Sequence, residues 1–173
     1  CWMALNQAVA LAECKHIEPT WVGRWERERD RIRDWIETHC WSEERQSYTF
    51  WAGSKGLDAS VALMHQYGQE VSPKRMLSTL KAIRDELGAG PEMIYRYTGV
   101  DKEEKTFIAC AFWMACALAT LGGQEEGEAT LKSLRETLSG GKRAGIMGEM
   151  YNVHQHKCCG NLPQGLSHLT VIC

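Results

Sequence analysis

The stretch EEKTFIACAFWMACALATL, residues Glu103–Leu121, is the most apolar part of the chain. In a helix its apolar side chains cover nearly the whole circumference, and they are Phe107, Ile108, Cys110, Ala111, Trp113, Met114, Ala117, Leu118 and Leu121. A helix that is apolar all round is buried on every side. The stretch therefore predicts a central helix that other elements surround.

Outward from this helix, the sequence predicts about seven helices of two kinds in alternation. Three are amphipathic with charged outer faces, Trp21–Cys40, Pro73–Leu87 and Gln124–Leu138. The more apolar ones are Cys1–His16, Leu57–Tyr67, Glu103–Leu121 and one that follows Gly160. This alternation is typical of helix hairpins stacked around an inner ring, as in an α/α toroid. A helical solenoid is the structural alternative, but no consensus recurs at a fixed period.

Length, composition and charge predict a single ordinary globular domain. The chain has 173 residues, of which 44% are hydrophobic and 24% charged, and its formal net charge is -2. That charge gives no electrostatic reason to expect nucleic acid or an anionic membrane as a partner. The longest apolar runs, such as Ile108–Leu121, are too short to span a bilayer.

The cysteines predict reduced thiols in a cytoplasmic protein rather than a disulfide framework. There are eight, and most of them fall within apolar helical patterns, where a free thiol acts as a small hydrophobe. His154, His156, Cys158 and Cys159 are metal-ligand types close together, but no second ligand pair accompanies them. We therefore expect no metal and no cofactor, and we expect His168 to be a hydrogen-bonded core histidine.

The longer loops carry aromatic, arginine and carboxylate side chains, and they should meet where the inner helices begin. Within the first loop, residues 42–54 favour a short extended segment or hairpin. The side chains expected at this rim are Tyr48, Phe50, Trp51, Asp58, Tyr95, Arg96, Tyr97, Glu103, Glu104, Glu149, Tyr151 and His154. Sugar rings stack on aromatic side chains, and their hydroxyls bind arginine and carboxylates, so this set suits a carbohydrate.

Seven segments occur in this order along the chain: CWMALNQAVALAE, ERDRIRDWIETHCW, GLDASVALM, MIYRYTG, TFIACAFWMACALATLGG, GIMGEMYN and GNLPQGLSHL. They resemble segments of glycoside hydrolase family 15, which includes glucoamylases, glucodextranases and certain bacterial trehalases, and the phrases around CAFW and GNLPQGLSH are the most specific. The resemblance implies part of an (α/α)6 barrel and inverting hydrolysis of α-glucosidic bonds in a disaccharide or oligosaccharide. It also implies that residues 1–173 are the C-terminal portion of the catalytic domain, and we expect both ends to be cut.

The resemblance also implies roles for individual residues. By motif, Glu149 is the general base, and Arg96 contacts substrate hydroxyls together with Glu104, Tyr95, Trp51 and Tyr151. Lys105 stands where the family has glycine, so the loop shape at Glu104 departs from the pattern. The family's general acid lies in a Trp-Glu motif ahead of the segment resembling CWMALNQA, and that motif is absent here. Since inversion needs two carboxyl groups, we expect the isolated chain to be inactive.

Other interpretations of these residues stay open at this point. A loop glutamate such as Glu149 is commonly just solvated, and Arg96 could form a structural salt bridge. Glu104 could cap the helix that follows it, since a carboxylate is favourable in the first turn. Tyr48 and Trp51 could be core aromatics.

A second class of function is a non-catalytic toroid for regulation or protein contact, similar to the glucoamylase-like domains of phosphorylase kinase regulatory subunits. In either case the isolated chain should expose apolar inner-helix surface and self-associate.

Overall fold

The helices of this computed structural model surround one buried helix, as the sequence predicts. The structure describes residues 1–64, 72–139 and 145–172. Its α-helices are α1 (Trp2–Glu13), α2 (Val22–His39), α3 (Pro73–Leu87), α4 (Ile108–Leu121), α5 (Gln124–Ser139) and α6 (Gly165–Leu169). Three 3-10 helices accompany them, η1 (Pro19–Trp21), η2 (Ala59–Met64) and η3 (Val100–Lys102).

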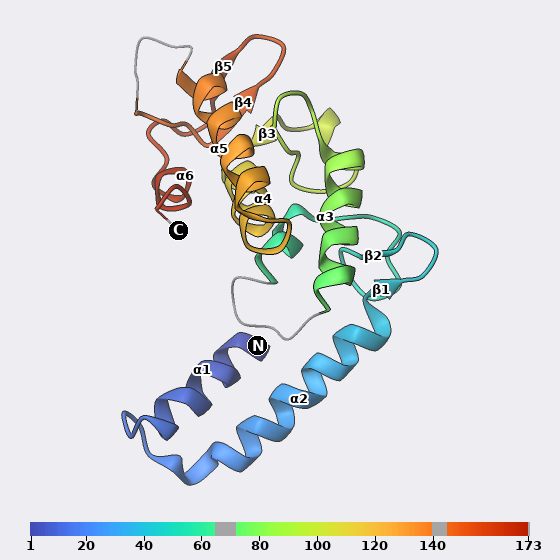
Figure 1. The fold of residues 1–173 in the computed structure, drawn as a ribbon, viewed down its shortest axis with the longest axis vertical. Coiled ribbons are helices and arrows are strands. Elements are labelled where there is room, and N and C mark those ends of the chain that lie inside the picture. The colour runs from blue at the N-terminus through green and yellow to red at the C-terminus, as the bar shows by residue number, and fades with distance from the viewer. Residues whose placement is uncertain (65–71, 140–144, 173) are drawn as a thin grey trace.

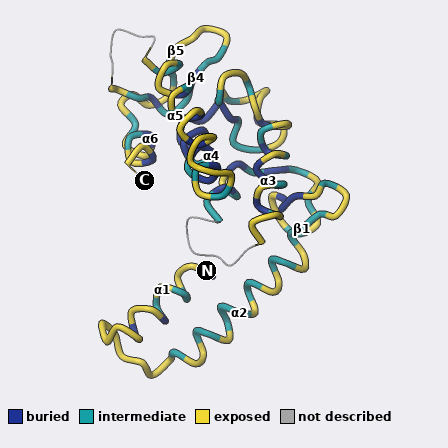
Figure 2. The backbone as a smooth tube through the Cα atoms, viewed as in Figure 1, coloured by how far each residue is buried: buried dark blue, intermediate teal, exposed yellow. Residues whose placement is uncertain are grey.

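The central helix is α4, which packs against α5, α3, η2 and α6 (Figure 1). Nine of its fourteen residues are buried, and Figure 2 shows its backbone largely dark blue. It begins at Ile108, five residues after the predicted start. The reason is that Thr106 and Phe107 form a strand, β3, whose partners come from a distant part of the chain.

Two small antiparallel sheets hold the loops at the ends of the helices. β1 (Trp41–Ser42) and β2 (Ser47–Tyr48) form the predicted hairpin. The second sheet joins β3 (Thr106–Phe107), β4 (Met150–Asn152) and β5 (Lys157–Cys159) in that order. This second sheet was not predicted from the sequence, because strands of two or three residues are too short to show an alternation of apolar and polar residues.

The hydrophobic core has two parts, and α4 contributes to both. One part lies between α3, η2 and α4, and it includes Tyr48, Leu57 and Met114. The other lies between α4, α5 and β4, and it includes Phe112 and Tyr151. A helix that is apolar on every side must pack against other elements on every side, and the two parts of the core provide these contacts for α4.

The hairpin of α1 and α2 extends away from this body, with α1 lying along α2 (Figure 1). The remaining predicted helices differ from the structure in form. η2 replaces the start of the predicted helix Leu57–Tyr67, of which residues 65–67 lie outside the described ranges. The helix predicted to follow Gly160 begins only at Gly165 as α6, which has five residues, because residues 160–164 form a turn.

Candidate functional site

Backbone hydrogen bonds join the loops that precede η2, α4 and α6 into one rim. Asp58 forms an isolated antiparallel bridge with Tyr97, and the Ala59 N–H donates to the Arg96 carbonyl at 2.8 Å. The pairing of β3 with β4 then links the Arg96 loop to the Glu149 loop. The predicted gathering of loops where inner helices begin is therefore present for these three segments.

Glu149 is half-buried and held by Asn161 of the GNLP turn. The Glu149 N–H donates to the Asn161 carbonyl at 2.9 Å, and the Glu149 carbonyl accepts from the Ile108 N–H at 3.1 Å. In the side chain, Oε2 accepts from the Asn161 backbone N–H at 3.2 Å and from Asn161 Nδ2 at 3.1 Å. A carboxylate oriented by two donors on one oxygen keeps its other oxygen for a further partner such as water.

Gly160 makes room for this carboxylate. Its φ is +74°, and a Cβ built there would lie 2.9 Å from Glu149 Oε2 and 3.1 Å from Glu149 Cβ. No other residue type fits that approach without moving the glutamate. The conformation of the β5-to-turn segment therefore determines where the Glu149 carboxylate lies.

Arg96 and Glu104 form an ion pair beside this loop. The Arg96 guanidinium lies 5.5 Å from the ring centres of both Tyr97 and Phe107, so aromatic faces flank the cation. Burial opposes the charge, but the hydrogen bond and charge of Glu104 outweigh it and raise the pKa of Arg96. The helix-capping alternative for Glu104 is wrong, because α4 begins at Ile108 and has no acidic residue in its first turn.

The charged groups of the rim lie together near the start of α4. Asp58, Arg96 and Glu104 all lie close enough to the buried Cys110 for their charges to act on its thiol. Burial first, and then the charge of Asp58, raise the pKa of Cys110, so the thiol stays neutral. Asp58 also accepts the Ser60 N–H at 2.7 Å, which is the local capping role that its position before η2 allows.

Phe107 connects this cluster to Glu149. Its ring contacts the Arg96 guanidinium, and in the sheet it is paired with Met150, the residue that follows Glu149. Glu149 and Lys105 both act electrostatically on the Cys159 thiol, which places Lys105 on the same side of the rim. Phe107 was predicted only as an apolar residue of the central helix and Asn161 was given no role, because neither contact has a local sequence signal.

The predicted aromatic side chains of the rim divide into exposed and buried ones. Trp51 is 60% exposed and Phe50 is 38% exposed. Tyr48 is only 1% exposed and belongs to the core, so its proposed place on the rim is wrong. Tyr151 is 4% exposed, and its hydroxyl donates to the Thr137 carbonyl at 3.4 Å. The structure therefore makes Tyr151 a packing residue rather than a sugar contact.

Tyr95 points to a different hollow from Arg96, its neighbour in the chain. Its N–H donates to the Leu87 carbonyl at 2.8 Å, and its ring lines a cavity of about 320 Å³ at the end of α3. Tyr97 lines the same cavity, together with Glu86 and Asp101.

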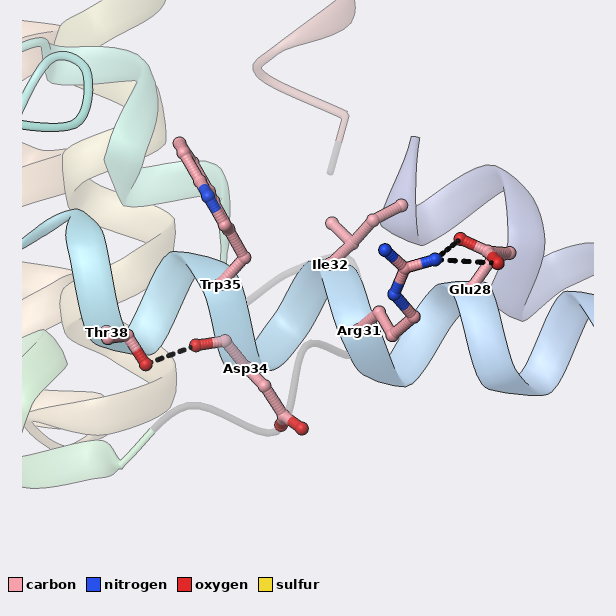
Figure 3. A pocket seen from close by; sticks show the side chains of 6 residues that line it. All are labelled: Glu28, Arg31, Ile32, Asp34, Trp35 and Thr38. Carbon is pink, nitrogen blue, oxygen red and sulfur yellow. Dashed lines mark hydrogen bonds and ion pairs between the residues drawn. The ribbon is translucent and has the colours of Figure 1, made fainter.

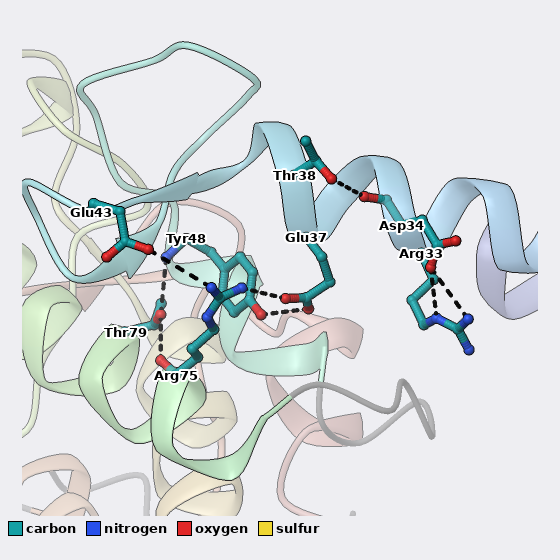
Figure 4. A network of polar contacts seen from close by, with 8 residues as sticks. All are labelled: Arg33, Asp34, Glu37, Thr38, Glu43, Tyr48, Arg75 and Thr79. Carbon is teal, nitrogen blue, oxygen red and sulfur yellow. Dashed lines mark hydrogen bonds and ion pairs between the residues drawn. The ribbon is translucent and has the colours of Figure 1, made fainter.

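A polar network fixes the β1–β2 hairpin to α2 and α3 (Figure 4). Tyr48 Oη donates to Glu37 Oε1 at 2.6 Å, and Arg75 Nη1 donates to Glu37 Oε2 at 2.6 Å. The Arg75 guanidinium also lies 4.6 Å from the centre of the Trp41 ring. This network sets the position of the loop that carries Phe50 and Trp51.

A hollow lies along α2 of the outward hairpin, and Figure 3 shows the side chains that line it. It measures about 510 Å³, and all six of its lining residues come from α2, including the exposed Trp35 and the Glu28–Arg31 ion pair at 3.1 Å. A hollow on one face of one helix offers no converging catalytic groups.

The His154–Cys159 segment forms part of the turn and the second strand of the β4–β5 hairpin, and its two histidines are exposed in the turn. Within residues 1–64, 72–139 and 145–172, no group of three or more metal-ligand side chains is arranged around a common point. The seven cysteines in these ranges are free. His168 is hydrogen-bonded as predicted, with Nδ1 2.7 Å from the Gln164 carbonyl and Nε2 accepting from the Met147 N–H at 3.2 Å.

The profile of glycosyl hydrolases family 15 matches residues 1–140. The chain belongs to this family. A trehalase from Mycobacterium tuberculosis is 31% identical over 180 residues, which cover 99% of this chain and 25% of that protein. A trehalase from Thermoplasma acidophilum is 26% identical over 175 residues, which cover 99% of this chain and 29% of that protein. The chain thus spans less than a third of the length of these relatives.

Solved structures with the same fold are glycosidases. One glycosidase variant, solved in complex with glucose, matches with a TM-score of 0.80 at 16% identity, over 98% of this chain and 47% of that one. A wild-type glycosidase matches with a TM-score of 0.74 at 17% identity, over 88% and 43%. These matches confirm the predicted all-α fold as part of an (α/α)6 toroid. Among the described helices, none has the length and apolar character needed to cross a bilayer.

Proposed function

We propose that this chain is part of a glycoside hydrolase that cleaves α-glucosidic bonds with inversion, and that Glu149 is the general base. The observation that carries the proposal is the Glu149 carboxylate, which Asn161 orients in a loop that the β3–β4 pairing joins to the loop of the Arg96–Glu104 pair. Membership of family 15 and the similarity to proteins named trehalases support the reaction class.

In this proposal Glu149 removes a proton from the water that attacks the anomeric carbon. Arg96 and Glu104 bind hydroxyls of the glucosyl unit, because a guanidinium and a carboxylate offer charge-assisted donors and acceptors. Trp51 adds an apolar face for a sugar ring. Tyr95 lies outside this group, on the cavity at the end of α3.

Inversion also needs a carboxylic acid to protonate the leaving oxygen, roughly 6.5–9.5 Å from the base. In the family this acid lies in a Trp-Glu motif ahead of the segment that corresponds to CWMALNQA, whereas the Trp-Glu pair of this chain, Trp25-Glu26, follows that segment and lies in α2. We therefore propose that this chain contributes the base half of the site and that alone it does not turn over substrate. We also propose a cytoplasmic location, because the seven cysteines of the described ranges are free thiols.

The test is an activity screen of the full-length protein on trehalose, maltose and kojibiose, with the product anomers followed by NMR. We expect hydrolysis of at least one of them, with β-glucose released first from the non-reducing unit. Retention of the α configuration would contradict the inverting mechanism, and inactivity on all α-glucosides would contradict the enzyme class.

The alternative is a non-catalytic toroid for regulation or protein contact. The residues ahead of the segment CWMALNQA decide between the two, because only the enzyme needs the Trp-Glu acid motif there. The ion pair between Arg96 and Glu104 is compatible with both functions, since an ion pair can also be purely structural.

A further inference from the structure

The loop that leads to Glu149 is bonded to the start of α6. This loop forms no helix or strand of its own, and β4 begins only after Glu149. The Met147 carbonyl accepts from the Gln164 N–H at 3.0 Å, and the Gly148 carbonyl accepts from Ser167 Oγ at 2.7 Å. The two residues that precede the proposed base are therefore both attached to the same short segment.

His168 adds a bond to this loop that depends on the tautomer of its ring. Nδ1 lies 2.7 Å from the Gln164 carbonyl, and Nε2 accepts from the Met147 N–H at 3.2 Å. Because a carbonyl can only accept, Nδ1 carries the proton of the neutral ring, and Nε2 keeps a lone pair for Met147. The Gly145 carbonyl is also 3.2 Å from Nε2, but it could bond only to a protonated nitrogen. The contact with Gln164 thus selects the tautomer that holds Met147.

The backbone ahead of Glu149 is also confined by β5. A Cβ built at Gly148 would lie 3.1 Å from Cys158 Cβ and 3.1 Å from the Cys159 carbonyl oxygen. Ser167, which donates to the Gly148 carbonyl, is completely buried. The peptide that precedes Glu149 is therefore held against both α6 and β5.

These contacts act on the backbone of the base rather than on its carboxylate. Asn161 contacts the Glu149 side chain directly, whereas His168 bonds to the residue two positions before it. A catalytic group keeps its geometry only when the residues behind it are themselves held in place. A displacement of about 1 Å in such a group can lower the rate about a hundredfold.

We propose that His168 is a positioning residue for Glu149. Through Nε2 it holds Met147, and together with the bond from Ser167 to Gly148 it sets where the backbone of the base lies. The inference rests on the proposed function, because it takes Glu149 as the general base. It gives α6 a role in the reaction although no residue of α6 has to touch the substrate.

Two amide substitutions separate the two nitrogens of the His168 ring. The amide of glutamine lies about as far from Cα as Nε2 does, so His168→Gln can still accept from Met147. The amide of asparagine lies about as far as Nδ1 does, so His168→Asn keeps only the contact with the Gln164 carbonyl. In the full-length protein His168→Asn should lower kcat on the preferred α-glucoside about ten- to hundredfold with KM nearly unchanged. His168→Gln should retain most of kcat.

Hydrogen exchange measured by mass spectrometry gives a second readout that does not depend on activity. The peptide that contains Met147 and Gly148 should exchange faster than in wild type for His168→Asn and at the wild-type rate for His168→Gln. His16→Asn, at an exposed histidine that follows α1, should match wild type in kcat and in exchange of this peptide.

Three results would overturn the positioning role. They are a wild-type kcat for His168→Asn, an equal loss of kcat in the asparagine and glutamine variants, and a loss that appears in KM alone. Failure of the proposed function is recognised separately, because wild-type turnover by Glu149→Gln would remove the base while the exchange contrast at Met147 would persist.

Discussion

At the residue scale, Glu149 depends on two neighbours that have no ionisable group. Asn161 donates twice to its Oε2, and Gly160 leaves space for it. The GNLP turn, rather than an oppositely charged side chain, therefore sets the position of the carboxylate. A substitution at Gly160 therefore tests the site more directly than a substitution of most charged residues does.

Gly160→Ala should lower both stability and activity. At φ +74° an alanine costs about 1–2 kcal/mol, and its Cβ would displace the Glu149 carboxylate. Gly53→Ala is the matched control, because Gly53 has φ +76° and a Cβ there meets no atom within 4 Å. Urea unfolding should show a loss of stability for both, larger for Gly160→Ala because its Cβ also meets Glu149, while trehalose turnover by the full-length protein should fall only for Gly160→Ala. Equal turnover in the two variants would count against the placement of Glu149.

Single residues differ in how far the sequence predicts them. Roles for Glu149 and Arg96 could be predicted because short family motifs surround them, and these roles stay predictions. The burial of Tyr48 and Tyr151 could not be predicted. The local sequence around such a tyrosine does not show whether its hydroxyl contacts water, Glu37 or the Thr137 carbonyl. Those partners are 11 and 14 residues away, and only the fold brings them near.

At the element scale, α4 and α5 approach each other most closely at Gly127. A Cβ at Gly127 would lie 2.2 Å from Ala119 Cβ and 2.8 Å from its backbone nitrogen. Small residues on both helices thus permit the contact that covers one side of α4. This close approach explains why a glycine is kept inside a helix, where it is intrinsically unfavourable.

Gly127→Ala should therefore destabilise the protein by about 1–3 kcal/mol, as overpacking does, although alanine is the better helix former. Gly23→Ala, in the first turn of α2, should be neutral or stabilising by up to about 1 kcal/mol, because its nearest atom is 3.6 Å away. Thermal or urea unfolding of the two variants measures the contrast. Stabilisation by both substitutions would mean that α4 and α5 are not packed as described.

The hairpin anchor predicts a dependence of stability on alkaline pH. Burial first, and then the hydrogen bond and charge of Glu37, raise the pKa of Tyr48 well above its usual value. The unfolded chain therefore loses the Tyr48 proton at lower pH than the folded chain does. The free energy of unfolding should be unaffected by Tyr48 below about pH 10 and should fall above it, by at most about 1.4 kcal/mol per pH unit for this group.

Tyr48→Phe should remove part of that alkaline fall, and it should also lower stability at neutral pH through the lost bond to Glu37. Urea unfolding at pH 8, 10 and 11 makes the comparison. The variant will still lose some stability as the pH rises, because burial also raises the pKa of buried thiols such as Cys110. An unchanged slope would show that Tyr48 does not titrate differently in the folded state.

Elements whose apolar residues recur with a clear period could be predicted from the sequence, and the other elements could not. The apolar run of α4 and the stripes of α3 and α5 indicate helices that the structure confirms. The sheet that joins β3 to β4 depends on pairing of Thr106 with Tyr151, a contact across 45 residues. Such a contact leaves no local pattern, so the start of α4 was placed too early.

At the scale of the whole molecule, apolar side chains remain exposed along the C-terminal segment. Leu166, Leu169, Val171 and Ile172 are all exposed, beside a cavity of about 470 Å³ between α4, α5 and α6. Several exposed apolar side chains in one short segment favour association in water. The all-α toroidal fold was predictable from the alternation of helices, whereas the location of this exposed surface was not.

The 173-residue chain should therefore self-associate through this segment. Sedimentation velocity at rising concentration should show growing oligomers for wild type and weaker association for the double variant Leu169→Lys, Ile172→Lys. Leu77→Lys, at an exposed leucine on α3, should behave as wild type does. A wild-type chain that stays monomeric at every concentration would refute the prediction.

The role of Glu149 is tested most directly by the turnover number of the full-length protein with Glu149→Gln. The glutamine keeps the size of the side chain and an oxygen that Asn161 can contact, but it cannot take a proton from water. We predict a fall in kcat on the preferred α-glucoside of about 10²–10⁴-fold, the usual contribution of a general base. Glucose binding, measured by calorimetry, should remain close to that of wild type. A variant that keeps near wild-type turnover would contradict the assignment of Glu149 as the base.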